Sequence, residues 1–119
     1  KVEWVRYAGL PDHADHAVVQ RQMGGRASGI LSFGLKSSDA DPRAAGARFL
    51  DALQLFTRLV NIGDAKSLAT HPASTTHKQL SDADLAAAGV TPTMLRISVG
   101  LENTDDLIDD FEQAFAHIG

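Results

Sequence analysis

One segment in the middle of the chain has the pattern of a helix packed against a core, and it constrains the fold more than any other. Asp41 can cap its first turn, and Pro42 suits the first helical position. Apolar side chains then recur at steps of four, three and four residues, at Phe49, Leu53, Phe56 and Val60. Gly63 can end a helix because glycine readily adopts left-handed backbone geometry. The pattern predicts one amphipathic helix that begins at Pro42 and is closed by residues 61–63.

Segments of strand length, rich in β-branched and other apolar residues, lie on both sides of this helix. We expect strands at residues 1–7, 30–35, 66–69 and 94–99, and in the last of them Leu95, Ile97 and Val99 share one face. Further helices are predicted at residues 12–23, at residues 81–88, and from the caps Asn103 and Thr104 to Ile118. This order predicts an α+β fold in a single domain over residues 1–119, with a small, mostly antiparallel sheet and amphipathic helices packed on one of its faces.

Five acidic residues gather at the start of the last predicted helix: Asp105, Asp106, Asp109, Asp110 and Glu112. Negative charge near a helix N-terminus complements the helix dipole. Consecutive positions on a helix do not converge on one ion. We therefore expect capping and a solvated helix face from this cluster, and no metal site.

The composition excludes several classes of function. The chain has no cysteine, which rules out disulfides, thiolate metal sites and a cysteine nucleophile. Eleven Lys and Arg against fifteen Asp and Glu give a net charge of −4, so nucleic acid is not an expected partner. No apolar run approaches the ~18 residues of a membrane span, and we expect a cytoplasmic protein without membrane contact. The first residue is Lys1 instead of Met, and we expect the chain to be part of a longer protein.

Arg96 interrupts the last predicted strand with a fixed charge, on the face that it shares with Met94 and Ser98. An arginine at such a position needs a polar partner or water. One interpretation is that this face meets solvent, since arginine is seldom buried unpaired. The other is a carboxylate clamp, because a guanidinium can direct two parallel N–H donors at the two oxygens of a carboxylate. The strand pattern leaves both interpretations open.

Two loops have compositions that occur in functional sites. Residues 71–77 combine two histidines with one serine and two threonines, but they contain no third metal ligand and no nucleophile-elbow pattern. Hydrogen bonding within the loop, or to a ligand, is the expected use of these hydroxyls. Residues 24–29 are glycine-rich, yet Ile30 and Leu31 follow where a phosphate-binding loop has Lys and Ser or Thr. We expect a turn there and no nucleotide site.

Three longer stretches, taken in order, resemble one enzyme family. They are residues 49–56 with 61–68, which include Asn-Ile-Gly-Asp-Ala-Lys-Ser, residues 71–77 (His-Pro-Ala-Ser-Thr-Thr-His), and residues 95–102 (Leu-Arg-Ile-Ser-Val-Gly-Leu-Glu). Together they resemble the C-terminal domain of the pyridoxal-phosphate (PLP) enzymes of cysteine and methionine metabolism, over nearly the whole chain. Within this family, Asn-Ile-Gly-Asp-Ala-Lys-Ser followed by His-Pro-Ala-Ser-Thr-Thr-His is most similar to the O-acetylhomoserine sulfhydrylases.

The resemblance implies the C-terminal domain of a fold-type I PLP enzyme that catalyses a γ-replacement, in which O-acetylhomoserine and sulfide give homocysteine and acetate. It implies PLP in the complete enzyme, where the cofactor withdraws electrons. None is expected on this chain alone, which would be inactive, because none of its four lysines has the family's Ser-x-Thr-Lys setting. The implied partners are an N-terminal PLP-binding domain, further copies in a homo-oligomer (a tetramer) and a small amino-acid substrate.

The resemblance also implies roles for three residues. Arg96 would hold the α-carboxylate of the substrate, and Asn61, through its backbone N–H, and Thr76 would act around the same carboxylate. No residue of this chain is implied to be catalytic, to bind the cofactor or to ligate a metal. Two alternatives stay open: methionine γ-lyase or cystathionine synthase or lyase chemistry within the family, and a free-standing, non-catalytic amino-acid-binding module.

Overall fold

The computed structural model describes residues 1–38 and 40–118 and confirms the predicted α+β class. One sheet contains the strands in the order β1-β2-β5-β4-β3. The strands are β1 (Val2–Arg6), β2 (Ile30–Leu35), β3 (Thr57–Arg58), β4 (Leu68–Thr70) and β5 (Met94–Ser98). Neighbouring strands are antiparallel except β3 and β4, which run parallel. The predicted strands are therefore confirmed within one or two residues, whereas the sequence pattern does not predict β3.

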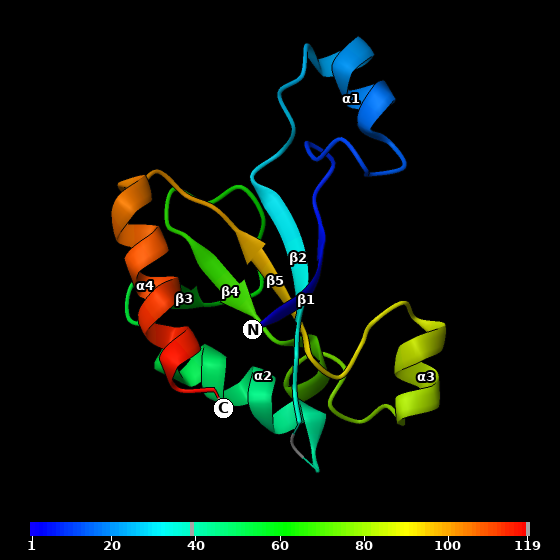
Figure 1. Cartoon of the computed structure of the whole chain (residues 1–119), viewed down its shortest axis with the longest axis vertical. Helices are drawn as coiled ribbons and strands as arrows, with labels where there is room; N and C mark the ends of the chain where they lie inside the picture. The colour runs from blue at the N-terminus through cyan, green and yellow to red at the C-terminus, as the bar shows by residue number, and fades with distance from the viewer. Residues whose placement is uncertain (39, 119) are drawn as a thin grey trace.

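Helices occupy three of the connections between these strands, and one more helix follows β5. They are α1 (His16–Met23), α2 (Pro42–Ala52), α3 (Asp82–Ala87) and α4 (Thr104–Ala116), with the short 3-10 helix η1 (Pro72–Ser74). Figure 1 shows α2 and α4 together beside the sheet, and α1 apart from it at the end of the long excursion between β1 and β2. Within the described residues, no helix is both long enough and apolar enough to cross a membrane.

The main core lies between one face of the sheet and the pair α2 and α4. The register places Phe33 opposite Leu95, and Ile97 between Leu31 and Ala69. Phenylalanine rings from the sheet, the helices and the segment after α2 fill this layer with centroids 4.7–6.3 Å apart: Phe33, Phe49, Phe56, Phe111 and Phe115. Burial of each large apolar side chain stabilises the fold by about 1.5–3 kcal/mol. The prediction of amphipathic helices on one face is thus confirmed for α2 and α4.

The central helix ends earlier than the sequence pattern predicts. α2 stops at Ala52, and Leu53 already has extended backbone geometry, with φ −62° and ψ 134°. Phe56 is nevertheless buried and stacks on Phe111, so it satisfies the apolar spacing without being helical. Val60 is exposed. The prediction of a single helix closed by residues 61–63 is therefore wrong in its second half.

The carboxylate of Asp110 explains this early end. It accepts hydrogen bonds from the backbone N–H groups of Gln54, Leu55 and Phe56 at 2.9, 2.9 and 3.2 Å, in place of the bonds that a longer helix would make. Burial by itself would raise the pKa of Asp110, but these donors outweigh it and hold the pKa below its usual range. Asp110 is only 5% exposed, so the expectation of a solvated acidic face is wrong for this residue. The predicted cap Asn103 is confirmed.

The ends of the remaining helices and strands differ by a few residues from the predicted ends. α1 begins at His16 because residues 12–15 form turns. The helix predicted at residues 81–88 is confirmed as α3, and Ser81 caps it, its hydroxyl accepting the N–H of Asp84 at 3.2 Å. Val99 follows the end of β5 and is 37% exposed, unlike Leu95 and Ile97 before it.

Candidate functional site

Arg96 lies on the sheet face opposite the main core. Successive residues of a strand point to opposite faces, so the burial of Leu95 and Ile97 against the helices directs Arg96 to the other side. Its neighbours across the sheet are Ser32 on β2 and Thr70 on β4. Arg96 is half-buried, and no carboxylate of residues 1–38 or 40–118 forms an ion pair with it. These neighbours therefore leave its charge without a compensating anion.

The loop between β3 and β4 approaches Arg96 through Asn61. Nη2 of Arg96 donates to the carbonyl oxygen of Asn61 over 3.5 Å, at the limit of hydrogen-bond range. The side chain of Asn61 is used within its own turn, where Oδ1 accepts the N–H of Ile62 at 2.9 Å. The structure therefore joins Arg96 and Asn61 through the carbonyl of Asn61, whereas the resemblance implies a role for its N–H.

Residues 61–67, which we call the 61–67 loop, follow β5 and the segment after it in the same direction. The next contact lies two residues further along both segments. There the N–H of Gly63 donates to Oγ of Ser98 at 3.1 Å. The carbonyl of Ala65 then accepts the N–H of Leu101 at 2.9 Å. The loop is thus attached to its neighbour at intervals by polar contacts, starting at the guanidinium.

Glu102 binds the last residue of the 61–67 loop, Ser67. Its two oxygens accept the N–H of Ser67 at 2.6 Å and the hydroxyl of Ser67 at 2.8 Å. The same hydroxyl accepts the N–H of Gly100 at 2.8 Å. The N–H of Ser67 lowers the pKa of Glu102 below its usual range although burial opposes this, so the carboxylate is ionised at neutral pH. Gly100 leaves the necessary space, since a Cβ atom there would lie 2.4 Å from the carbonyl oxygen of Ala65.

The Ser67–Glu102 contact has no signal in the sequence pattern. Ser67 stands just before a short strand and Glu102 just after another, and neither position has a periodicity that marks it. Their contact appears only when β4 and β5 are paired in register, with Leu68 opposite Ser98.

Thr76 stands apart from the other two predicted site residues. It is exposed in the turn after η1, and its Oγ1 shares a hydrogen bond with Nδ1 of His77 at 2.8 Å. Across the described part of the chain, no hydrogen bond joins it to Arg96 or Asn61. A hollow of about 500 Å³ opens beside it, lined by residues 75–80. The structure thus brings two of the three predicted residues together.

His71 anchors the loop that carries Thr76. Its ring is fully buried, with Nε2 2.8 Å from the carbonyl oxygen of Pro92 and Nδ1 2.8 Å from Oγ of Ser74. Burial lowers the pKa of His71, against the opposing effect of the Pro92 carbonyl, and favours a neutral ring that donates from Nε2 and accepts at Nδ1. Ser74 therefore donates its proton to a buried ring inside the fold. This geometry matches the expected hydrogen bonding within the loop.

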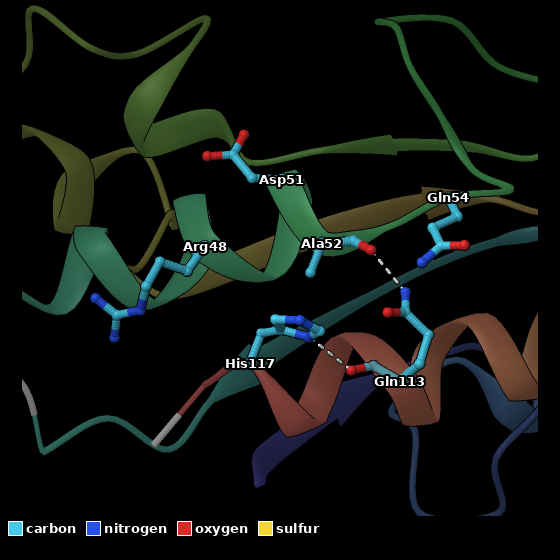
Figure 2. A pocket seen from close by; sticks show the side chains of 6 residues that line it. All are labelled: Arg48, Asp51, Ala52, Gln54, Gln113 and His117. Atoms are coloured by element: carbon cyan, nitrogen blue, oxygen red, sulfur yellow. Dashed lines mark hydrogen bonds between the residues drawn. The ribbon is translucent and has the colours of Figure 1, made fainter.

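The hollow in Figure 2 lies on the helical layer. It measures about 440 Å³ and is lined by Arg48, Asp51, Ala52, Gln54, Gln113 and His117. Gln113 crosses it to donate to the carbonyl of Ala52 at 2.6 Å, and Nδ1 of His117 lies 2.9 Å from the carbonyl oxygen of Gln113. Since α2 and α4 cover the core face of the sheet, this hollow is on the opposite side from Arg96.

A PLP site needs a lysine for the imine and an Asp or Arg partner for the pyridine nitrogen. The four lysines of this chain lie in different surroundings. Nζ of Lys1 is held 2.7 Å from a backbone carbonyl at the end of the chain, and Lys36 is exposed. Lys66 has Glu102 beside it, whose two oxygens are already bound. Lys78 lines the hollow of residues 75–80, which contain no acidic residue and no arginine.

The sequence of the chain is similar to those of PLP-dependent enzymes over nearly its whole length. The sequence profile described as Cys/Met metabolism PLP-dependent enzyme matches residues 1–116. O-acetyl-L-homoserine sulfhydrylase 1 of Thermus thermophilus is 46% identical over 116 residues, which cover 98% of this chain and 27% of that protein. L-methionine gamma-lyase of Pseudomonas deceptionensis is 46% identical over 113 residues, which cover 95% of this chain and 27% of that protein.

Solved structures agree with these matches. A crystal structure of a cystathionine gamma-lyase from Micromonospora echinospora aligns with a TM-score of 0.82 and 38% identity, over 97% of this chain and 29% of that chain. The chain therefore spans a little more than a quarter of the length of the relatives that it matches.

Proposed function

The chain belongs to the Cys/Met metabolism family of PLP-dependent enzymes, and from this premise we propose that it is the C-terminal, substrate-carboxylate-binding domain of a longer enzyme. The observation that carries the proposal is Arg96, a half-buried guanidinium to which the described residues offer no carboxylate. A guanidinium in this state favours an anion from outside, and the α-carboxylate of an amino acid supplies one.

The contribution of this chain to the reaction is binding and orientation. A guanidinium has five N–H donors, and one of those on Arg96 points at the carbonyl of Asn61. Two others can bind the two carboxylate oxygens in parallel, which fixes the directions of the amino group and the side chain of the substrate. Orientation of this kind can lower a barrier by several kcal/mol. Asn61 steadies the guanidinium. A contact of the Thr76 hydroxyl with the same carboxylate rests on the family resemblance, since the hydroxyl bonds to His77 in this structure.

For the complete enzyme we propose a γ-replacement, in which sulfide displaces acetate from O-acetylhomoserine and homocysteine forms. PLP would be bound by an N-terminal domain outside this chain, in a cytoplasmic homo-oligomer such as a tetramer. The sulfhydrylase of Thermus thermophilus supports this reaction. The methionine gamma-lyase of Pseudomonas deceptionensis has the same identity and supports a second candidate, elimination from methionine, which would use the same carboxylate clamp.

The test uses the complete protein purified with PLP. We expect O-acetylhomoserine and sulfide to yield homocysteine and acetate in equal amounts, at a rate that exceeds the formation of 2-oxobutanoate from methionine. The reverse order of rates would replace the transferase by the lyase. If the intact mass of the natural product is close to that of these 119 residues and neither reaction occurs, the chain is a free-standing amino-acid-binding module.

A further inference from the structure

We propose that Glu102 is a positioning residue for Arg96, which it reaches through Ser67 and the 61–67 loop. This inference rests on the proposed carboxylate clamp and adds a residue to it. The carboxylate of Glu102 bonds to Ser67 and fixes the end of the loop whose beginning contacts Arg96.

The spacing of the contacts supports a mechanical connection between the two ends. Asn61 contacts Arg96 and Gly63 contacts Ser98, each 35 positions further along the chain, and Ala65 then contacts Leu101. Ser67 contacts both Gly100 and Glu102, which are 33 and 35 positions further along. From Asn61 to Ala65 the loop thus runs in the same direction as its neighbour, and at Ser67 it turns into β4, which is antiparallel to β5. A displacement at one end of the 61–67 loop is therefore passed to the other end unless an intermediate contact breaks.

Apolar packing does little to hold this loop in place. Ile62 is 63% exposed, and the two residues before the loop, Leu59 and Val60, are exposed as well. The loop therefore depends on its polar contacts, and Glu102 makes two of them with one charged group. Hydrogen bonds to an ionised acceptor are roughly twice as strong as those between neutral groups. The carboxylate of Glu102 is thus the charged attachment at the end of the loop, next to the bond in which the carbonyl of Ser67 accepts the N–H of Thr57 at 2.9 Å.

The consequence for Arg96 follows from the length of its side chain. A free arginine side chain populates many rotamers, and ordering it costs conformational entropy. The carbonyl of Asn61 at 3.5 Å is a weak restraint that acts only if the loop keeps it in place. When Glu102 releases the loop, the guanidinium loses its fixed direction. Binding of a carboxylate must then also order the Arg96 side chain, which weakens the binding.

The experiment compares two ligands that differ only in the carboxylate. In the complete, PLP-loaded protein, competition against O-acetylhomoserine gives inhibition constants for L-norleucine and for pentylamine, which is norleucine without its carboxyl group. We expect Glu102→Gln to weaken norleucine by about 5- to 20-fold, on the scale of small misplacements of a binding group, and pentylamine by less than about two-fold. The matched control is Glu112→Gln, an exposed carboxylate on α4, which we expect to leave both constants unchanged.

The outcomes separate this inference from the proposed function. If Arg96→Ala weakens norleucine selectively and Glu102→Gln does not, the positioning role is wrong while the clamp stands. If Arg96→Ala has no selective effect, the clamp itself is wrong, and this inference with it. An equal loss for both ligands in Glu102→Gln indicates a merely structural role and overturns the proposal.

A second variant covers the case in which Glu102→Gln does not fold. Ser67→Ala removes the hydroxyl and keeps the 2.6 Å contact between the N–H of residue 67 and Glu102. The variant also removes the acceptor of the Gly100 N–H, which belongs to the same attachment. We expect it to weaken norleucine by about 2- to 5-fold with pentylamine unchanged, because one of the two contacts with Glu102 remains. No selective loss for norleucine would count against the proposal in the same way.

Discussion

The ring of His71 packs so closely against Gly46 on α2 that a Cβ atom at Gly46 would lie 2.3 Å from Nε2. The same Nε2 donates to the carbonyl of Pro92, so the ring has no free direction in which to move. Glycine is unfavourable inside a helix, and its presence here reflects the need for space. The contact attaches the loop of residues 71–77 to the helical layer.

Gly46→Ala should therefore destabilise the fold although alanine favours helices. The clash with a buried, hydrogen-bonded ring has the character of overpacking, which costs about 1–3 kcal/mol, against about 1 kcal/mol gained in helix propensity. Urea unfolding of the 119-residue chain measures the difference. Adding His71→Ala restores the space, so the double variant should lose less than the sum of the two single losses. Strict additivity would show that the two residues do not interact.

Asp110→Asn should lower the free energy of unfolding by about 1.5–3 kcal/mol, because an amide offers one oxygen where the carboxylate serves three N–H groups. Asp109→Asn changes the neighbouring, exposed residue and should stay within about 0.5 kcal/mol of the parent. Chemical denaturation of both variants in parallel makes the comparison. Similar losses in the two would mean that the acidic cluster acts through its overall charge.

Acid should destabilise the chain in two windows. His71 has a lowered pKa when folded, so below its ordinary pKa of about 6.5 the unfolded state binds more protons and stability falls with falling pH. Asp110 also has a lowered pKa, so its contribution is present above about pH 3.9 and is lost below it. Stability measured from pH 7.5 to 5 should decline in the parent and much less in His71→Asn. The exposed His117→Asn should retain the slope of the parent.

The sequence predicts those parts of the fold whose signals are local. Ser81 and Asn103 are residue types that favour helix N-caps, each stands four positions before a buried leucine, and both cap a helix. The end of α2 is different, because its cause is Asp110, more than fifty residues further along the chain. Phe56 matches the apolar spacing of a helix although it lies beyond α2. The segment after α2 crosses the same core and buries the Phe56 side chain there.

The candidate site also contains residues with a local sequence signal and residues without one. Arg96 is visible in the sequence as a charge that interrupts an apolar strand, and the structure explains it by the alternation of the two faces of β5. Asn61 and Thr76 follow only from the family resemblance, and the structure joins the first of them to Arg96. The contact between Ser67 and Glu102 depends on the register of β4 against β5, which no local pattern encodes.

Arg96→Lys in the complete protein tests the clamp most directly, since it retains the charge and removes the planar pair of donors that two carboxylate oxygens need. A bidentate, charge-assisted contact contributes about 1.5–3 kcal/mol, so kcat/KM for O-acetylhomoserine should fall by roughly 10- to 100-fold, and further in Arg96→Ala. The melting temperature should change little, because no carboxylate of the described residues pairs with Arg96 in the folded chain. A structural role predicts the opposite combination, a lower melting temperature with kinetics nearly intact. If kcat/KM of Arg96→Lys stays within about two-fold of the parent, a difference of only ~0.4 kcal/mol, Arg96 does not hold the substrate carboxylate.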